Sequence, residues 1–225
     1  MLSLVATPIG NLSDITLRAL ETLKSADVIA CEDTRHSLIL LRHYSISKPL
    51  VSYHEHNEAM RTAELIVALR EGRHVAIITD AGMPGVSDPG HRLLRACQAE
   101  GLPFTIIPGA SAVVTGLIGS GFSPEPFFFG GFLPPKSGGR EREVLAAIER
   151  AAAGVTSVFY ESPHRITKTL AVLAEKAPEQ AVCVGRELTK TFEEFRRGTG
   201  PELLAHYTAK PPKGEITLVI GARTK

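Results

Sequence analysis

The segment 79–90 combines the residue types that most favour a ligand site. It reads Thr-Asp-Ala-Gly-Met-Pro-Gly-Val-Ser-Asp-Pro-Gly and directly follows a strongly apolar run. Small residues let a ligand approach the backbone, and open α/β sheets bind ligands at the carboxyl ends of their strands. Asp80 is positioned there to accept hydrogen bonds from ribose hydroxyls or an amino group. The alternative is a turn rich in glycine and proline in which Asp88 caps the next helix.

A second loop, 107–112, follows the next expected strand and opens an apolar helix. Ser111 is a natural N-cap, and the backbone N–H groups of the same turn are able to bind a carboxylate or a phosphate. Two adjacent strand ends therefore carry glycine-containing turns, which favours a ligand site at that edge more than either turn does alone.

Two polar clusters, 32–35 (Glu-Asp-Thr-Arg) and 53–58 (Tyr-His-Glu-His-Asn-Glu), also stand where strands are expected to end. An imidazole such as His54 is suited to substrate contact or to proton transfer near neutral pH. The alternative is that Asn57 and Glu58 simply begin a helix. A metal site is disfavoured, because no third and fourth ligand follow at suitable spacing.

The second half carries further polar clusters at 160–165, 185–190 and 213–215. Their cations favour a local basic patch that holds phosphates by charge-assisted hydrogen bonds. Members of this patch, with one cation from the first half, are Arg35, Arg165, Arg186, Lys190, Arg196 and Arg197. For the last two, solvated charges balanced by neighbouring glutamates are an equal alternative.

Composition limits the classes of function. Lys and Arg number 25 against 24 for Asp and Glu, so contact with a nucleic acid must be local. No G-x-G-x-x-G or P-loop motif is present, which argues against a dinucleotide dehydrogenase and a P-loop NTPase. The absence of a secretion signal or a bilayer-length apolar run, together with three isolated cysteines interpreted as reduced and buried, indicates a soluble cytoplasmic protein.

The pattern of apolar runs predicts an α/β fold with a mostly parallel sheet in the first half. Strands are expected at 3–6, 28–31, 50–53, 74–79 and 104–107, with helices between them, the clearest at 58–70. Stretches rich in Pro, Gly and Ser at 119–126 and 133–139 predict a boundary between domains 1–119 and 120–225. The second domain is expected to contain helices at 141–153, 164–176 and 203–207 and strands at 155–160, 181–184 and 215–220.

These motifs together resemble one family, the tetrapyrrole-methylase-like (class III) S-adenosylmethionine-dependent methyltransferases, and within it the branch that methylates ribosomal RNA. The matching segments are 6–12, 31–35, 53–57, 80–90, 108–111, 131–137, 159–165, 186–190 and 213–215. The resemblance implies two small α/β domains with the cofactor in a cleft between them, usually in a homodimer. It also implies 2'-O-methylation of a cytidine in the decoding region of 16S rRNA, with the rRNA of the 30S subunit as the expected partner. Members commonly continue into a C-terminal helical extension, whereas the sequence given ends at Lys225.

The resemblance also assigns roles to residues. Cofactor contacts are expected from Asp80, Ala81, Gly82, Met83, Val86, Ser87, Ala110, Ser111, Tyr160, Glu161, Leu188, Gly214 and Glu215. Substrate contacts are expected from Arg35, His56, Asn57, Arg165 and Arg186. His54 is the first candidate for the base that helps a ribose hydroxyl react, followed by Glu32, Asp33 and Lys190. Two alternatives remain: methylation of a small tetrapyrrole or other acceptor, and a nonenzymatic RNA-binding module for ribosome assembly.

Overall fold

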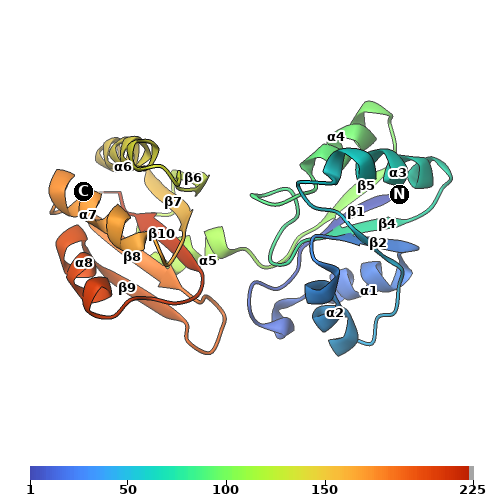
Figure 1. Ribbon diagram of the computed structural model, residues 1–225, viewed down its shortest axis with the longest axis horizontal. Helices are drawn as coiled ribbons and strands as arrows, with labels where there is room; N and C mark the ends of the chain where they lie inside the picture. Colours follow the sequence, from blue (N-terminus) through green and yellow to red (C-terminus); the bar gives the residue numbers. More distant parts are fainter. Residues whose placement is uncertain (223–225) are drawn as a thin grey trace. The chain divides into compact units, whose positions relative to one another are not determined.

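The structure is a computed structural model that describes residues 1–222 (Figure 1). The chain forms two compact units, Met1–Ser111 and a second that begins at Ala112. In the described part of the chain, no helix has the length and apolar character that a membrane span requires.

The first unit is a five-stranded parallel sheet with helices on both faces (Figure 1). Its strand order is β3-β2-β4-β1-β5. The strands are β1 (Leu2–Val5), β2 (Val28–Cys31), β3 (Leu50–Ser52), β4 (Val75–Ile78) and β5 (Phe104–Ile107). The helices are η1 (Leu12–Asp14, a 3-10 helix), α1 (Leu17–Ser25), α2 (Thr34–His43), α3 (Glu58–Arg70) and α4 (His91–Ala99).

The first sheet is buried on both faces because successive side chains of its central strands enter opposite cores. Leu4 and Ile77 belong to the core formed with α3 and α4. Val5 and Ile78 belong to the core formed with α1 and α2. This burial explains why β2 and β4 are continuous apolar runs in the sequence rather than alternating ones, and β1 departs from such a run only at the buried Ser3.

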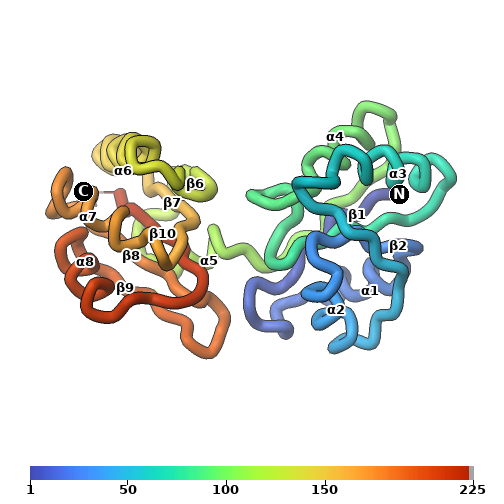
Figure 2. The backbone as a smooth tube through the Cα atoms, viewed as in Figure 1, coloured from blue at the N-terminus to red at the C-terminus, as the bar shows by residue number. Residues whose placement is uncertain are grey.

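The second unit contains a mixed sheet with the order β6-β7-β10-β8-β9. Only β6 and β7 run parallel; the other neighbours are antiparallel. The strands are β6 (Phe127–Phe132), β7 (Thr156–Glu161), β8 (Ala181–Arg186), β9 (Glu194–Thr199) and β10 (Ile216–Ile220). The helices are α5 (Ala112–Ser120), α6 (Ser137–Ala152), α7 (Ile166–Lys176) and α8 (Gly200–Ala209), and Figure 2 traces the backbone through them.

The units divide before α5, so the boundary expected between 119 and 120 is placed too late. The reason is that α5 packs on the second sheet, where Val113 and Leu117 join the core formed by Val219 of β10. Gly116 allows this close approach, since a Cβ at that position would lie 2.5 Å from Cγ2 of Thr217. The pattern rich in Pro and Gly thus marks the loop after α5 rather than the boundary itself.

The α/β prediction is confirmed, and β2, β5 and α3 have the expected bounds. Two strands at the edges of the second sheet, β6 and β9, are absent from the prediction. The sequence of β9 is Glu-Phe-Arg-Arg-Gly-Thr. Its charged residues hide the apolar pattern of a strand, and an edge strand tolerates them because only one of its sides contacts the sheet. The three cysteines are free and buried, as expected.

Candidate functional site

Backbone hydrogen bonds hold together the loops that follow the strands of the first sheet. Thr7, after β1, and Gly82, after β4, each donate their backbone N–H to the other's carbonyl oxygen, at 2.9 and 3.2 Å. The Thr7 hydroxyl also donates to the carbonyl of Thr79 at 3.1 Å. The Asp33 N–H, after β2, donates to Oδ1 of Asp80 at 3.3 Å. Three strand ends that are distant in sequence therefore form one edge.

A cavity of about 950 Å³ lies at this edge. Its lining residues are Glu32, His54, Glu55, His56, Glu58, Ser87, Asp88, Pro89, His91, Arg92 and Arg95. Four of them, Glu32, His54, His56 and Ser87, are among the residues predicted from sequence. Other predicted residues of the first unit do not line it: Asp33, Arg35, Asn57, Asp80, Ala81, Gly82, Met83, Val86, Ala110 and Ser111.

The carboxylates of Glu32 and Asp88 line this cavity and interact with that of nearby Asp80, and within residues 1–222 none of the three forms an ion pair with a cation. Burial and the charge of Asp80 raise the pKa of Glu32 above its ordinary value. Burial and the charges of Glu32 and Asp80 raise the pKa of Asp88 to about 7. A carboxyl group with a pKa near neutrality is suited to exchange a proton during a reaction.

Sequence reasoning missed Asp88 as a chemical group and considered it only as a helix cap. The structure corrects that alternative, since α4 begins at His91 with Gly90 at the N-cap position. The basic residues of α4 at the cavity, His91, Arg92 and Arg95, were also missed. The repeat of basic residues at positions 92 and 95 was the available signal, because residues three apart share one helix face.

His54 is held by Asn57, the residue that precedes α3. The side-chain amide of Asn57 donates to the carbonyl of Ser52 at 3.2 Å, which fixes the orientation of the amide. Its Nδ2 also lies 2.9 Å from the hydroxyl oxygen of Ser52 and 3.2 Å from Nε2 of His54, so three acceptors share its two N–H groups. Within residues 1–222, Nδ1 of His54 is buried without a hydrogen-bond partner. One ring nitrogen of His54 thus contacts the Asn57 amide and the other is buried.

Asp33 and Arg35 satisfy each other at the start of α2. Asp33 accepts from the backbone N–H of Arg35 at 2.8 Å and pairs with its guanidinium at 2.9 Å. Hydrogen bonds from Arg35 lower the pKa of Asp33 to about 2, which makes this carboxylate a weak base. The Arg35 side chain is 89% exposed and remains accessible to a ligand.

The family follows from comparison of the chain with known proteins. Residues 1–204 match the model of the Tetrapyrrole (Corrin/Porphyrin) Methylases. The chain belongs to the tetrapyrrole methylase family. The family predicted by the sequence motifs is therefore confirmed.

Relatives of this methylase chain share its whole length. The Synechocystis sp. protein named Ribosomal RNA small subunit methyltransferase I is 46% identical and covers 100% of this chain and 80% of its own. The Thermotoga maritima protein of that name is 44% identical, and the match covers 99% of this chain and 98% of the Thermotoga protein. Two solved structures share the fold. Diphthine synthase has a TM-score of 0.78 and 15% identity, over 99% of this chain and 90% of its own. The methyltransferase CobJ has a TM-score of 0.71 and 18% identity, over 100% of this chain and 96% of its own.

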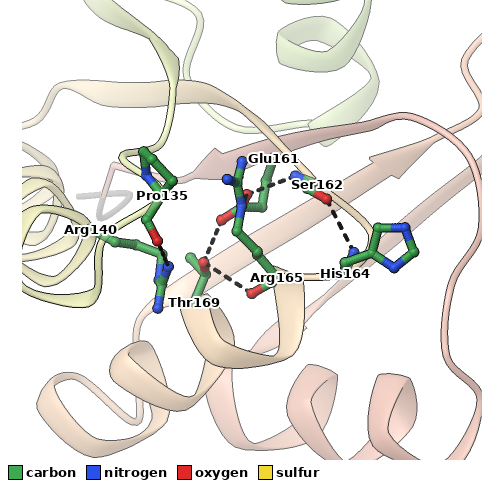
Figure 3. A network of polar contacts seen from close by, with 7 residues as sticks. All are labelled: Pro135, Arg140, Glu161, Ser162, His164, Arg165 and Thr169. Atoms are coloured by element: carbon green, nitrogen blue, oxygen red, sulfur yellow. Dashed lines mark hydrogen bonds and ion pairs between the residues drawn. The ribbon is translucent and has the colours of Figure 1, made fainter.

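In the second unit of the methylase chain, Glu161 forms a closed polar network (Figure 3). The carboxylate is buried and accepts from the backbone N–H of Ser162 at 2.7 Å, Nε of Arg165 at 3.2 Å and the hydroxyl of Thr169 at 2.6 Å. These bonds join the end of β7 to α7. The cofactor contact expected of Glu161 and the substrate contact expected of Arg165 stay predictions, and both side chains also have a structural role.

Lys190 joins the two remaining motifs of the second unit. Its Nζ lies 3.0 Å from Oε1 of Glu187 and 2.9 Å from Oε2 of Glu215. Although burial opposes its charge, the two carboxylates raise the pKa of Lys190, so it stays protonated and is unsuited to act as a base near neutral pH. Gly214 has a φ of +86°, and a Cβ there would lie 2.2 Å from Oε1 of Glu187, so this close junction requires glycine.

The other predicted residues of the second unit pack within it. Leu188 is buried, and its methyl groups lie beside Gly185 and Gly116. Tyr160 stacks edge-on against Phe129, with ring centroids 5.1 Å apart. Arg186 pairs with Glu194 at 3.2 Å. The segments 186–190 and 213–215 meet in these contacts, and the ligand contacts expected of their residues stay predictions.

The first unit fits the cofactor that the family implies. S-Adenosylmethionine carries a sulfonium and an ammonium group, and the uncompensated charges of Glu32, Asp80 and Asp88 complement both. Oδ1 of Asp80 accepts one backbone hydrogen bond, which leaves the rest of its carboxylate able to accept from a ligand. Within the described residues no group of three or more His, Cys, Asp or Glu is arranged to hold a metal ion.

Proposed function

We propose that this protein transfers the methyl group of S-adenosylmethionine to the 2'-oxygen of a cytidine ribose in the decoding region of 16S rRNA. The observation that carries the proposal is the cavity in which Glu32 and Asp88 stand without a paired cation. Family membership supports methyl transfer, and the names of the relatives support small-subunit ribosomal RNA as the acceptor.

When bound, S-adenosylmethionine supplies an electrophilic methyl group. Asp80 holds it by accepting hydrogen bonds, and the loop residues after β4 and β5, several of them small, let it approach the backbone. These are Ala81, Gly82, Met83, Val86, Ser87, Ala110 and Ser111. In the second unit Tyr160, Glu161, Leu188, Gly214 and Glu215 complete the proposed set.

Asp88 is the proposed base. Its pKa of about 7, raised by burial and by the charges of Glu32 and Asp80, allows it to take the proton of a ribose hydroxyl at neutral pH. Asp88 is favoured over His54 because Nε2 of the imidazole contacts the Asn57 amide and Nδ1 is buried. The chain's further contribution is to align the hydroxyl with the methyl group and to exclude water.

The acceptor RNA is proposed to lie along the basic wall of the same cavity. Arg92 and Arg95 are exposed on α4 and have no ion pair within residues 1–222. They are therefore free to bind phosphates. His56 also lines the cavity, while Asn57 positions His54 and so acts on the RNA indirectly.

Homodimer formation in the cytoplasm is part of the same proposal. Exposed apolar side chains of the second unit, including Val114 and Ile118 on α5 and Phe132 on β6, supply surface for a subunit contact. Light scattering at micromolar concentration is expected to give twice the 24.2 kDa mass of one chain. A particle of 24.2 kDa would contradict the dimer.

The reaction is tested with S-adenosylmethionine labelled in its methyl group. We expect label in 30S subunits that lack the modification, recovered after nuclease digestion as 2'-O-methylcytidine. Naked 16S rRNA and a porphyrinoid are assayed in parallel. Label in the porphyrinoid alone, or in a base rather than a ribose, would refute the proposed acceptor. Binding of RNA without methyl transfer or cofactor binding would indicate an assembly module instead.

A further inference from the structure

The second unit contains a cavity that is lined by only one of the residues predicted to bind cofactor or substrate, Arg186. It has a volume of about 380 Å³, within the range of small-ligand sites. It lies where the end of α8 and the segment 210–213 meet the ends of β8 and β9. We call it the Lys210 pocket. Its lining residues are Arg186, Phe192, Glu194, His206, Tyr207, Lys210, Pro211, Pro212 and Lys213.

Cations outnumber anions in the Lys210 pocket. Arg186, Lys210 and Lys213 face a single carboxylate, that of Glu194. Glu194 is already bonded to Arg186 at 3.2 Å and to Arg196, outside the pocket lining, at 2.8 Å. Within residues 1–222 neither lysine forms an ion pair. The pocket is thus an anion-attracting surface in a chain whose formal net charge is only +1.

Tyr207 supplies a hydrogen-bond donor at the wall of the pocket. The residue is 2% exposed, and within residues 1–222 its buried hydroxyl has no hydrogen-bond partner. Burial raises the pKa of Tyr207 to about 12, so the hydroxyl keeps its proton. An unsatisfied buried hydroxyl costs stability, and a ligand acceptor in the pocket would remove that cost.

Phe192 supplies an aromatic face. Phe192 is 71% exposed, more than any other phenylalanine within residues 1–222. Burial of that ring against a ligand is favourable, and nucleobases stack on aromatic side chains irrespective of sequence. The combination of an exposed ring with neighbouring lysines is typical of sites for single-stranded nucleic acid.

We propose that the Lys210 pocket binds one nucleotide of a single-stranded RNA segment. The base stacks on Phe192, the flanking phosphates contact Lys210 and Lys213, and the Tyr207 hydroxyl donates to an oxygen of the nucleotide. This inference rests on the proposed RNA substrate and adds an anchoring site on the second unit, separate in sequence from the residues assigned to chemistry.

The test measures the affinity of the full chain for a fluorescein-labelled single-stranded RNA of roughly ten nucleotides, a length within usual site sizes. Phe192→Ala is expected to weaken binding roughly tenfold or more, whereas Phe192→Trp keeps it, because only stacking distinguishes the two changes. The double variant Lys210→Gln with Lys213→Gln is expected to lower the slope of log affinity against log salt by about 1.4, since each lost phosphate contact contributes about 0.7.

Tyr207→Phe provides a readout that a purely structural role would not give. Removal of an unpartnered hydroxyl should leave the melting temperature equal or higher, while RNA affinity falls several-fold. Lys168→Gln is the matched control for the lysines, because Lys168 is exposed on α7 in the same unit. A duplex of the same sequence should compete poorly, since its bases are already stacked.

The outcomes separate this inference from the proposed reaction. If methyl transfer to 30S subunits occurs while Phe192→Ala and the lysine pair bind RNA like Lys168→Gln, the pocket is refuted and the reaction stands. If the pocket variants lose RNA affinity but the wild-type chain transfers no methyl group, the pocket stands and the reaction is refuted. Equal weakening by Phe192→Trp and Phe192→Ala would also refute stacking.

Discussion

Carboxylates at strand ends have opposite surroundings in the two units. In the first unit Glu32, Asp80 and Asp88 lie near one another, and no ion pair to any of them is found within residues 1–222. In the second unit Glu161 and Glu215 bond to Arg165 and Lys190. Acidic residues in similar motifs therefore have different roles. Carboxylates without an ion pair have pKa values that burial and neighbouring charges raise, whereas carboxylates paired with a cation connect secondary-structure elements.

The largest expected effect concerns Asp88. Asp88→Asn should lower kcat/KM for 30S methylation by roughly 10²–10⁴-fold, the contribution of a general base. In the wild-type chain kcat/KM should rise with pH around an apparent pKa of about 7, and the variant should lose that rise. Burial and the charges of Glu32 and Asp80 set this apparent pKa, and His54, His91, Arg92 and Arg95 line the same cavity.

Two controls make the Asp88 result specific. Asp33→Asn alters a carboxylate whose pKa is held at about 2, so it should leave the shape of the pH profile unchanged. Cofactor affinity, measured by calorimetry, distinguishes loss of the base from loss of binding. An unaltered pH profile in Asp88→Asn would transfer the role to another group, with His54 as the next candidate.

The second prediction tests the structural role of the paired acids. Glu161→Ala should lower the free energy of unfolding by about 2–4 kcal/mol, because it leaves the partly buried Arg165 guanidinium without its carboxylate and the Thr169 hydroxyl with only a 3.4 Å contact to the carbonyl of Arg165. Urea denaturation measures the change. Arg35→Ala removes an exposed pair and should have no measurable effect on stability. If the two variants were equally stable, the Glu161 network would not be structural.

The third prediction concerns cofactor affinity. Asp80→Ala should weaken S-adenosylmethionine binding by roughly 1–3 kcal/mol, since a ligand donor would lose its acceptor. Calorimetry on the folded variant gives the value, and Asp33→Ala is the neighbouring control. Unchanged affinity in folded Asp80→Ala would show that Asp80 does not bind the cofactor. The contrast between unpaired and paired carboxylates would then rest on Glu32 and Asp88 alone.

The smallest predicted effect is a pH dependence of stability. Folding raises the pKa of Asp88 from 3.8 to about 7, so the native state binds its proton more tightly than the unfolded state does. The free energy of unfolding should therefore fall as pH rises from about 4 to 7. Allowing for solvent screening of a half-buried group, the fall is about 1–2 kcal/mol. Asp88→Asn should remove it, and an unchanged slope would show that Asp88 is not perturbed.

Much of the fold was predictable because periodicity reports burial directly. The central strands β2 and β4 are continuous apolar runs since both of their faces are covered, and α3 shows its buried face in sequence. The edge strand β9 was not predictable, because charged residues on an edge obscure alternation. The position of the unit boundary depended on where α5 packs, which is a tertiary contact.

The sequence alone determined the family and which reactive residue types the chain contains, because motifs are defined by the types of their residues and by their order along the chain. It placed Asp80 and His54 at strand ends, because the ends follow from the hydrophobic pattern. Only the tertiary structure decided which acid is perturbed and which is paired. The pKa of Asp88 depends on Glu32 and Asp80, residues brought close by parallel strands. Charge interactions act through space, so spacing along the chain does not reveal them.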